Sequence, residues 1–148
     1  MSVEEYQVKV YPDRTEWYQN GQRHRLDGPA FEADNGTKVW YQNGQKHRLD
    51  GPAVEQSNGD KFWYQNGKLH RLDGPAVELS KGNKFWYQNG QLHRLDGPAV
   101  ENFDGSKEYW IEGQQYSYDE FIKKTSVHEL SVADIEKLLG YSVKIIKD

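Results

Sequence analysis

A block of 23 residues recurs four times without insertion or deletion, beginning at Trp17, Trp40, Trp63 and Trp86. Each copy opens with Trp-Tyr-Gln-Asn-Gly and continues, two positions later, with His-Arg-Leu-Asp-Gly-Pro-Ala. Fifteen of the 23 positions are the same in all four copies. A constant period of this length is typical of repeat proteins, in which each unit packs mainly on its neighbours. The fold and any function must therefore be built from one unit and its repetition.

Residues 37–59 show how one unit folds. The first six residues are mostly β-branched or aromatic and lead into Asn43-Gly44, the dipeptide that best fits a type I′ hairpin turn. The return strand is interrupted at Pro52, because proline has no N–H to donate and is normally excluded from central strands. Residues 53–55 resume the strand before the chain turns into the next unit. We expect an antiparallel meander with a row of bulges or corners, one at each of Pro29, Pro52, Pro75 and Pro98.

Both ends of the repeat array depart from the 23-residue unit. Residues 1–16 are predicted to form an N-terminal half-repeat cap, residues 17–108 the four repeats, and residues 109–148 a degenerate fifth repeat and a C-terminal cap. In that cap a capping box at Ser117 and Glu120 opens a helix through about Lys124. A second helix is predicted at 131–140 and a strand at 141–146. The fold class is mainly β: an elongated antiparallel β-hairpin repeat meander sheet with a small C-terminal α/β cap.

The composition excludes several functional classes. With 19 basic and 23 acidic residues the net charge is -4, so a diffuse basic surface for nucleic acid is not expected. The absence of cysteine excludes disulfides and thiolate metal sites. Neither a signal-peptide pattern nor an apolar run of membrane-spanning length is found, so we expect a cytoplasmic protein without membrane contact. No cofactor is expected, since no phosphate loop, nucleophile elbow or metalloprotease motif occurs.

The spacing Asn-Gly-x-x-His, with glycines following at fixed positions, resembles the MORN repeat family and its bacterial hairpin-repeat relatives. The longer string Trp-Tyr-Gln-Asn-Gly-x-x-His-Arg-Leu-Asp-Gly-Pro-Ala is also similar to repeat proteins of large tailed phages and giant viruses. The likeness covers roughly residues 8 to 113. It implies an elongated hairpin sheet with a binding or scaffolding role, such as a phage effector that inhibits a host defence protein. The chain differs from MORN proteins in having arginine directly after the histidine, and their membrane-lipid association is not carried over.

The tryptophans form the first candidate binding column. Alternate residues of a strand share a face, so Trp40 lies with Lys38 and Gln42 while Tyr41 lies opposite with Val39. Two strands per repeat would place successive tryptophans about 10 Å apart. Two interpretations stay open. Each indole either covers a neighbouring alanine or leucine as a half-buried structural group, or belongs to an aromatic face that binds a partner.

Histidine, arginine and aspartate recur next to one another and suggest either structure or recognition. Aspartate before glycine is ordinary turn chemistry, and arginines and aspartates of neighbouring repeats are able to pair as a ladder. A metal or catalytic role is disfavoured, because His and Asp three positions apart in an extended segment do not converge. The candidate partner- or ligand-binding residues are Trp17, Trp40, Trp63, Trp86, His24, His47, His70, His93, Arg25, Arg48, Arg71 and Arg94.

We therefore expect a non-enzymatic repeat protein that binds another macromolecule, most simply a protein, through its sheet face. A first alternative is a sponge that sequesters a small nucleotide-like ligand, with aromatic rings stacking on the base and arginines holding phosphates. A second alternative is a structural or oligomerising module. In that case the exposed first strand, residues 6–11, would pair with the same strand of another copy.

Overall fold

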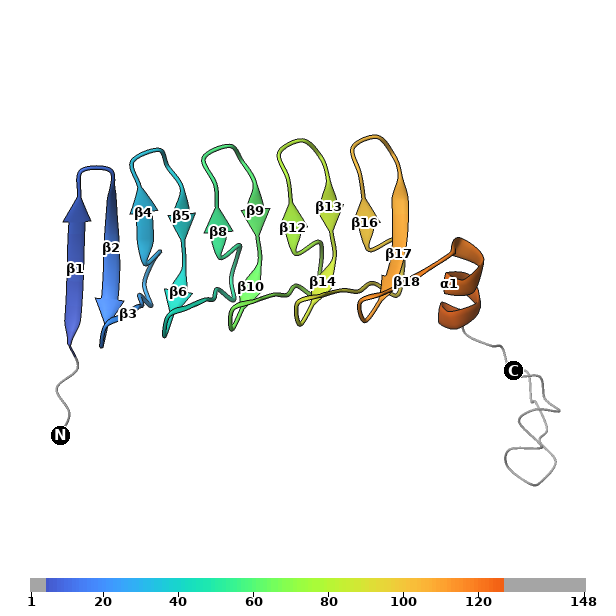
Figure 1. The fold of residues 1–148 in the computed structure, drawn as a ribbon, viewed down its shortest axis with the longest axis horizontal. Coiled ribbons are helices and arrows are strands. Elements are labelled where there is room, and N and C mark those ends of the chain that lie inside the picture. Colours follow the sequence, from blue (N-terminus) through green and yellow to red (C-terminus); the bar gives the residue numbers. More distant parts are fainter. Residues whose placement is uncertain (1–4, 127–148) are drawn as a thin grey trace, which may run out of the picture.

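The computed structural model describes residues 5–126 of the 148-residue chain. This part contains eighteen β-strands and one α-helix. The strands of the main sheet stand side by side in a single row that starts at β1, and α1 lies beyond the other end of the row (Figure 1). The predicted mainly β, elongated hairpin-repeat meander is confirmed. The second helix and the strand predicted at 131–140 and 141–146 lie outside the described residues.

The long sheet is a 12-stranded antiparallel meander in which spatial order follows chain order. Its strands are β1 (Tyr6–Tyr11), β2 (Arg14–Gln19), β4 (Phe31–Ala33), β5 (Lys38–Val39), β8 (Val54–Glu55), β9 (Lys61–Phe62), β12 (Val77–Glu78), β13 (Lys84–Phe85), β16 (Val100–Glu101), β17 (Lys107–Ile111) and β18 (Gln114–Tyr116), with β3 (Gln22–Arg23) paired to β2. Each 23-residue unit therefore contributes two strands to the long sheet.

The second, third and fourth units each also contain a two-stranded hairpin. These hairpins extend from the strand ends of the long sheet, at the lower side of Figure 1. These hairpins are β6 (Tyr41–Gln42) with β7 (Gln45–Lys46), β10 (Tyr64–Gln65) with β11 (Lys68–Leu69), and β14 (Tyr87–Gln88) with β15 (Gln91–Leu92). The turn residues Asn43 and Gly44 have φ values of 49° and 75°, as the predicted type I′ turn requires. The local Asn-Gly signal was therefore sufficient to place these turns.

The corner predicted at each proline is a loop that leaves the return strand. In the second unit the N–H of Trp40 donates to the carbonyl of Ala53 at 2.8 Å, and the carbonyl of Trp40 accepts from the N–H of His47 at 3.1 Å. One residue of the outgoing strand thus pairs with two residues that are six positions apart. The intervening residues 48–52 bulge out of the sheet, and we call each such segment a bulge loop.

The core is a thin line of small apolar side chains along the sheet. Val39 pairs with Val54, Val54 with Phe62, and the same pattern continues across the following strands. The four valines at these positions are at most 8% exposed. The alanine before each return strand is fully buried, namely Ala30, Ala53, Ala76 and Ala99. The valines lie on the face that carries phenylalanine and tyrosine, and the alanines, adjacent to them in sequence, lie on the face of the tryptophans. Both faces of the sheet therefore hold buried apolar side chains, which the alternation of residues alone left undecided.

The N-terminal unit replaces a core side chain by a buried charge. Glu16, at the position of Val39 in the next unit, is only 2% exposed. Its carboxylate accepts hydrogen bonds from Tyr18, from Nε of Arg14 at 2.7 Å and from Nη2 of Arg23 at 3.0 Å. Burial raises the pKa of Glu16, and the hydrogen bonds from Tyr18, Arg14 and Arg23 outweigh it and lower the pKa to about 2. The carboxylate is therefore fully charged and paired at neutral pH.

The two ends of the array are built differently. At the C-terminal end, α1 (Tyr118–Thr125) begins at the predicted capping box, in which Ser117 and Glu120 cap each other. The helix packs on the last unit through Phe121, whose ring centroid lies 4.9 Å from that of Tyr109. At the N-terminal end β1 pairs with β2 through the predicted turn at Pro12-Asp13, and all six residues of β1 are exposed.

Candidate functional site

Each bulge loop is held in place by its own arginine. In the second unit the guanidinium carbon of Arg48 lies 3.9 Å from the ring centroid of Trp40, which is a cation–π stack. Nε donates to Oδ1 of Asp50 at 2.9 Å, and Nη1 donates to the carbonyl of Pro52 at 3.2 Å and to Glu55 at 3.0 Å. The arginine therefore links the strand, the loop and the resumed strand of one unit.

The glycine of the loop makes this stack possible. A Cβ atom on Gly51 would lie 3.0 Å from the guanidinium carbon of Arg48. The side chain of Arg48 is thus enclosed between the indole on one side and the glycine backbone on the other. The same stack recurs with guanidinium-to-centroid distances of 4.3, 4.1 and 4.1 Å in the pairs Arg25–Trp17, Arg71–Trp63 and Arg94–Trp86.

The histidines connect one unit to the next. Nδ1 of His47 accepts the backbone N–H of Asn66, at 3.2 Å, from the hairpin turn of the following unit. Nδ1 also lies 3.0 Å from Oδ1 of Asn66, which can only accept, so the tautomer decides whether Nδ1 accepts from the backbone N–H or donates to this oxygen. His24, His70 and His93 make the same bond to the backbone N–H of Asn43, Asn89 and Glu112. The histidine column therefore fixes the spacing of the units.

The bulge loops expose a leucine and an aspartate at their tips. Leu26, Leu49, Leu72 and Leu95 are 75%, 76%, 75% and 55% exposed. The neighbouring aspartate of each loop is more than 80% exposed, whereas its arginine partner is mostly buried. Hydrogen bonds from these arginines hold the pKa of Asp27, Asp50, Asp73 and Asp96 below the usual range. The ridge of loops thus presents apolar groups and negative charge together.

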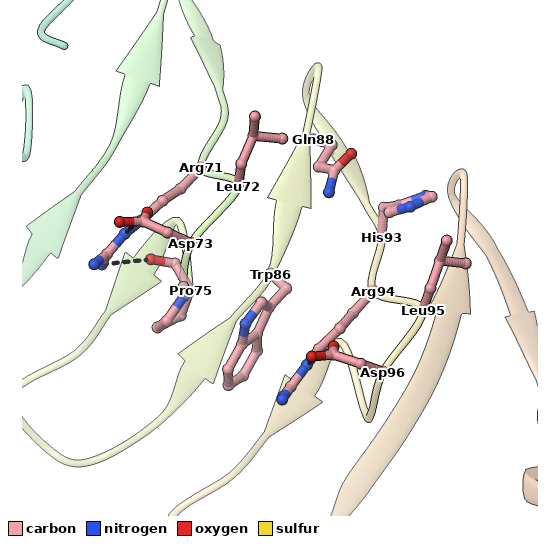
Figure 2. A pocket seen from close by; sticks show the side chains of 11 residues that line it. Arg71, Leu72, Asp73, Pro75, Trp86, Gln88, His93, Arg94, Leu95 and Asp96 are labelled. Atoms are coloured by element: carbon pink, nitrogen blue, oxygen red, sulfur yellow. Dashed lines mark hydrogen bonds and ion pairs between the residues drawn. The ribbon is translucent and has the colours of Figure 1, made fainter. Parts of the chain in front are cut away.

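Equivalent pockets lie between successive bulge loops. Figure 2 shows the one between the loops of the third and fourth units, where Trp86 stands between the preceding loop with Pro75 and its own Arg94. Its volume is about 650 Å³, and the two pockets before it measure about 640 and 600 Å³. A fourth, smaller pocket of about 320 Å³ lies at Trp17, where β1 takes the place of a preceding loop. Each pocket is lined by residues of two units, or of one unit and β1.

The three predicted columns meet in these pockets. Every one of the predicted tryptophans, histidines and arginines lines at least one of the four pockets. The indoles are half-buried, and the guanidinium of the same unit's arginine lies over one face of each ring. The predicted arginine–aspartate ladder between neighbouring repeats is wrong. The pair forms inside one unit, because the bulge loop folds back and brings Asp50 to Arg48.

Sequence reasoning missed the leucines. It took each of them as part of the turn that precedes the proline, although an invariant leucine among Asp, Gly and Pro is an unusual apolar residue in a turn. That anomaly was the available signal for an exposed contact group. The cluster around Glu16 was also missed, although Arg14, Glu16 and Tyr18 alternate along β2 and so share one face; only Arg23 joins it from β3.

The fold and these pockets define the protein as a β-hairpin repeat protein with tandem inter-repeat pockets. Comparison with known protein families, curated proteins and solved structures finds no match for this chain. Over residues 5–126 no group of three or more His, Cys, Asp or Glu side chains is arranged to hold a metal ion. The helix in this same range is too short and too polar to cross a membrane.

Proposed function

We propose that this chain is a non-enzymatic binding protein that holds an extended segment of another protein against its ridge of bulge loops. The observation that carries the proposal is the recurrence of one pocket, with the same tryptophan, arginine and exposed leucine, between successive units. Exposed leucines beside aromatic pockets are costly in water and are typical of surfaces that another protein covers. A repeated contact surface is also the usual way in which repeat proteins bind.

The spacing of the pockets indicates the kind of segment. With two sheet strands per unit, successive pockets lie about 10 Å apart. One turn of a polyproline II helix spans about 9.3 Å over three residues and returns the side chain to the same side, whereas residues three apart in a β-strand point to opposite faces. A partner segment in the polyproline II conformation that runs along the array therefore places every third side chain in a pocket. The segment expected is a polyproline II helix that carries an apolar residue at every third position.

The charge distribution favours a basic or neutral segment. The exposed ends of the loops carry aspartates, while the guanidinium of Arg48 is enclosed and already paired with Asp50 and Glu55. The nucleotide-like ligand has less support, since its phosphates would have to compete with these carboxylates for the arginines. Because the repeat resembles those of phage proteins, the concrete partner we propose is a host protein, such as a defence component.

Peptide binding tests the proposal. Peptides of equal length and composition, each with the same number of leucines or prolines set two, three or four positions apart and lysines at all other positions, are titrated against the protein by fluorescence anisotropy. We expect the three-residue period to bind tightest, and the double variant Leu49→Asp, Leu72→Asp to weaken binding by about tenfold or more per leucine. Phe103→Asp is the matched control, because Phe103 is as exposed as Leu72 but lies in the turn between β16 and β17. Equal binding of all three periods, or binding that the double variant leaves unchanged, would contradict the proposal.

A further inference from the structure

We propose that β1 pairs with β1 of a second copy of this chain, which would join the two long sheets into one across a two-fold axis at Val8. This interface adjoins the smallest of the four pockets, which Tyr6 and Val8 help to line, but none of the three pockets between bulge loops, and it does not depend on the proposed function. Three observations support this pairing: the direction of the backbone N–H and carbonyl groups of β1, the exposure of its side chains and its self-complementary sequence.

The backbone of Val8 points away from the molecule. Val8 pairs with Trp17 in β2, but the N–H of Trp17 donates to Ala30 and its carbonyl accepts from His24. The Val8–Trp17 pair is therefore not hydrogen-bonded between the strands, and the N–H and carbonyl of Val8 face outward. The flanking bond from the N–H of Asn20 to the carbonyl of Glu5, at 2.8 Å, agrees with this alternation. Val10 faces outward for the same reason, so the edge offers a regular set of donors and acceptors.

The side chains of β1 do not protect this edge against pairing with another strand. Val8 and Val10 are 57% and 77% exposed and lie on one face of the strand. Natural edge strands are usually protected by a charge, a proline or a bulge. The charged residue in β1, Lys9, instead lies over the ring of Tyr18 in β2, 4.5 Å from its centroid. The strand pairs in unbroken register with β2, and Pro12 falls in the turn beyond it.

The sequence of β1 fits a second copy in antiparallel register. With the axis at Val8, this valine faces its own copy, Tyr6 faces Val10, and Gln7 faces Lys9. Apolar residues thus meet on one face, and no like charges stand opposite one another. Repeat arrays generally need both ends capped. The last unit has α1 against it, whereas over residues 5–126 only β2 pairs with β1, so a second copy would cover the edge that the N-terminal half-repeat leaves exposed.

Disulfide cross-linking between single introduced cysteines tests the register of the two β1 strands, because the chain has no cysteine of its own. A hydrogen-bonded antiparallel pair places its Cα atoms about 5.5 Å apart, which a disulfide spans. We expect the V8C variant to form a disulfide-linked dimer under mild oxidation and V10C to form little. V10C is the matched control, because Val10 is the more exposed of the two and random collisions would favour it. Cross-linking of V8C no faster than that of V10C would overturn the proposal.

Light scattering at increasing concentration supplies the second measurement. One strand pair buries less than the roughly 1,200 Å² of stable complexes, so we expect a weak dimer that is evident at about 100 μM. Val8→Pro removes the outward N–H without removing a bond to β2, and we expect it to be monomeric. Val8→Thr keeps the N–H and the branched side chain and should still dimerise, while circular dichroism checks that both variants fold. A monomeric native chain at this concentration, or a dimer that Val8→Pro leaves intact, would overturn the proposal.

Discussion

Arg48 and Trp40 lie face to face, with the guanidinium carbon 3.9 Å from the centroid of the indole ring. The two residues are eight positions apart in the chain, and the loop that Arg48 opens is closed by its bonds to Pro52 and Glu55. Each unit of the array contains this closure once. The stack is therefore the contact on which the shape of the bulge loop, and with it the pocket and the exposed leucine, depends.

Arg48→Lys should lower the free energy of unfolding by about 1 to 2 kcal/mol. Lysine keeps the charge but has neither the planar group that stacks on Trp40 nor the fork that donates to several acceptors at once. Urea denaturation followed by tryptophan fluorescence measures the change. Lys81→Ala, which removes an exposed charge from a hairpin turn, is the control and should change the free energy by less than about 0.5 kcal/mol. Equal effects of the two variants would show that the stack contributes little.

Gly51→Ala should destabilise the protein through Arg48 rather than through the backbone. Its φ is not positive, so alanine is tolerated by the chain, but the new Cβ would lie 3.0 Å from the guanidinium carbon. We expect a loss of about 1 to 2 kcal/mol in the native chain and a clearly smaller loss in the Arg48→Ala background. Chemical denaturation of the four members of this double-mutant cycle measures the coupling. Strict additivity would mean that the two residues do not press on each other.

Glu112→Asn should stabilise the protein by about 0.5 to 1 kcal/mol. Glu112 stands where the repeats have asparagine, and its φ of 51° is the left-handed conformation that asparagine tolerates better. Thermal unfolding should show a higher midpoint for this variant. Glu112→Ala removes the same charge without relieving the backbone and should give no gain. A gain with alanine as well would assign the effect to charge instead of conformation.

Acid should destabilise the protein through Glu16. Its pKa is lowered to about 2 in the folded chain from an ordinary value of 4.5, so the unfolded chain binds more protons at acidic pH. The stabilisation is complete above about pH 5 and is lost as the pH falls toward 2, with a total on the order of 3 kcal/mol. Urea titrations of the native chain and of Glu16→Gln from pH 7 to 2.5 should converge as the pH falls. Parallel curves would show that Glu16 does not contribute to the acid dependence.

The hairpins and the proline corners were predictable because they depend on neighbours in sequence. Asn43 and Gly44 adopt positive φ for reasons internal to the two residues, and Pro52 interrupts a ladder wherever it occurs in a strand. The role of the arginine was not predictable. Arg48 contacts its partners only when the bulge loop is closed. The repeat sequence does not show whether the arginine pairs with the aspartate of its own unit or with that of a neighbouring unit. The exposure of Leu49 follows from the same closure.

The sequence by itself determined the period of the array, its turns and its antiparallel meander, since backbone φ preferences and missing N–H donors act locally. The lateral packing of one unit on the next decided that both faces of the sheet hold buried apolar side chains and where the pockets lie. That packing joins groups such as His47 and Asn66, which are 19 positions apart, and it sets Trp86 beside the preceding loop. Trp, His and Arg columns are visible in the chain, but only the tertiary structure turns them into one repeated site.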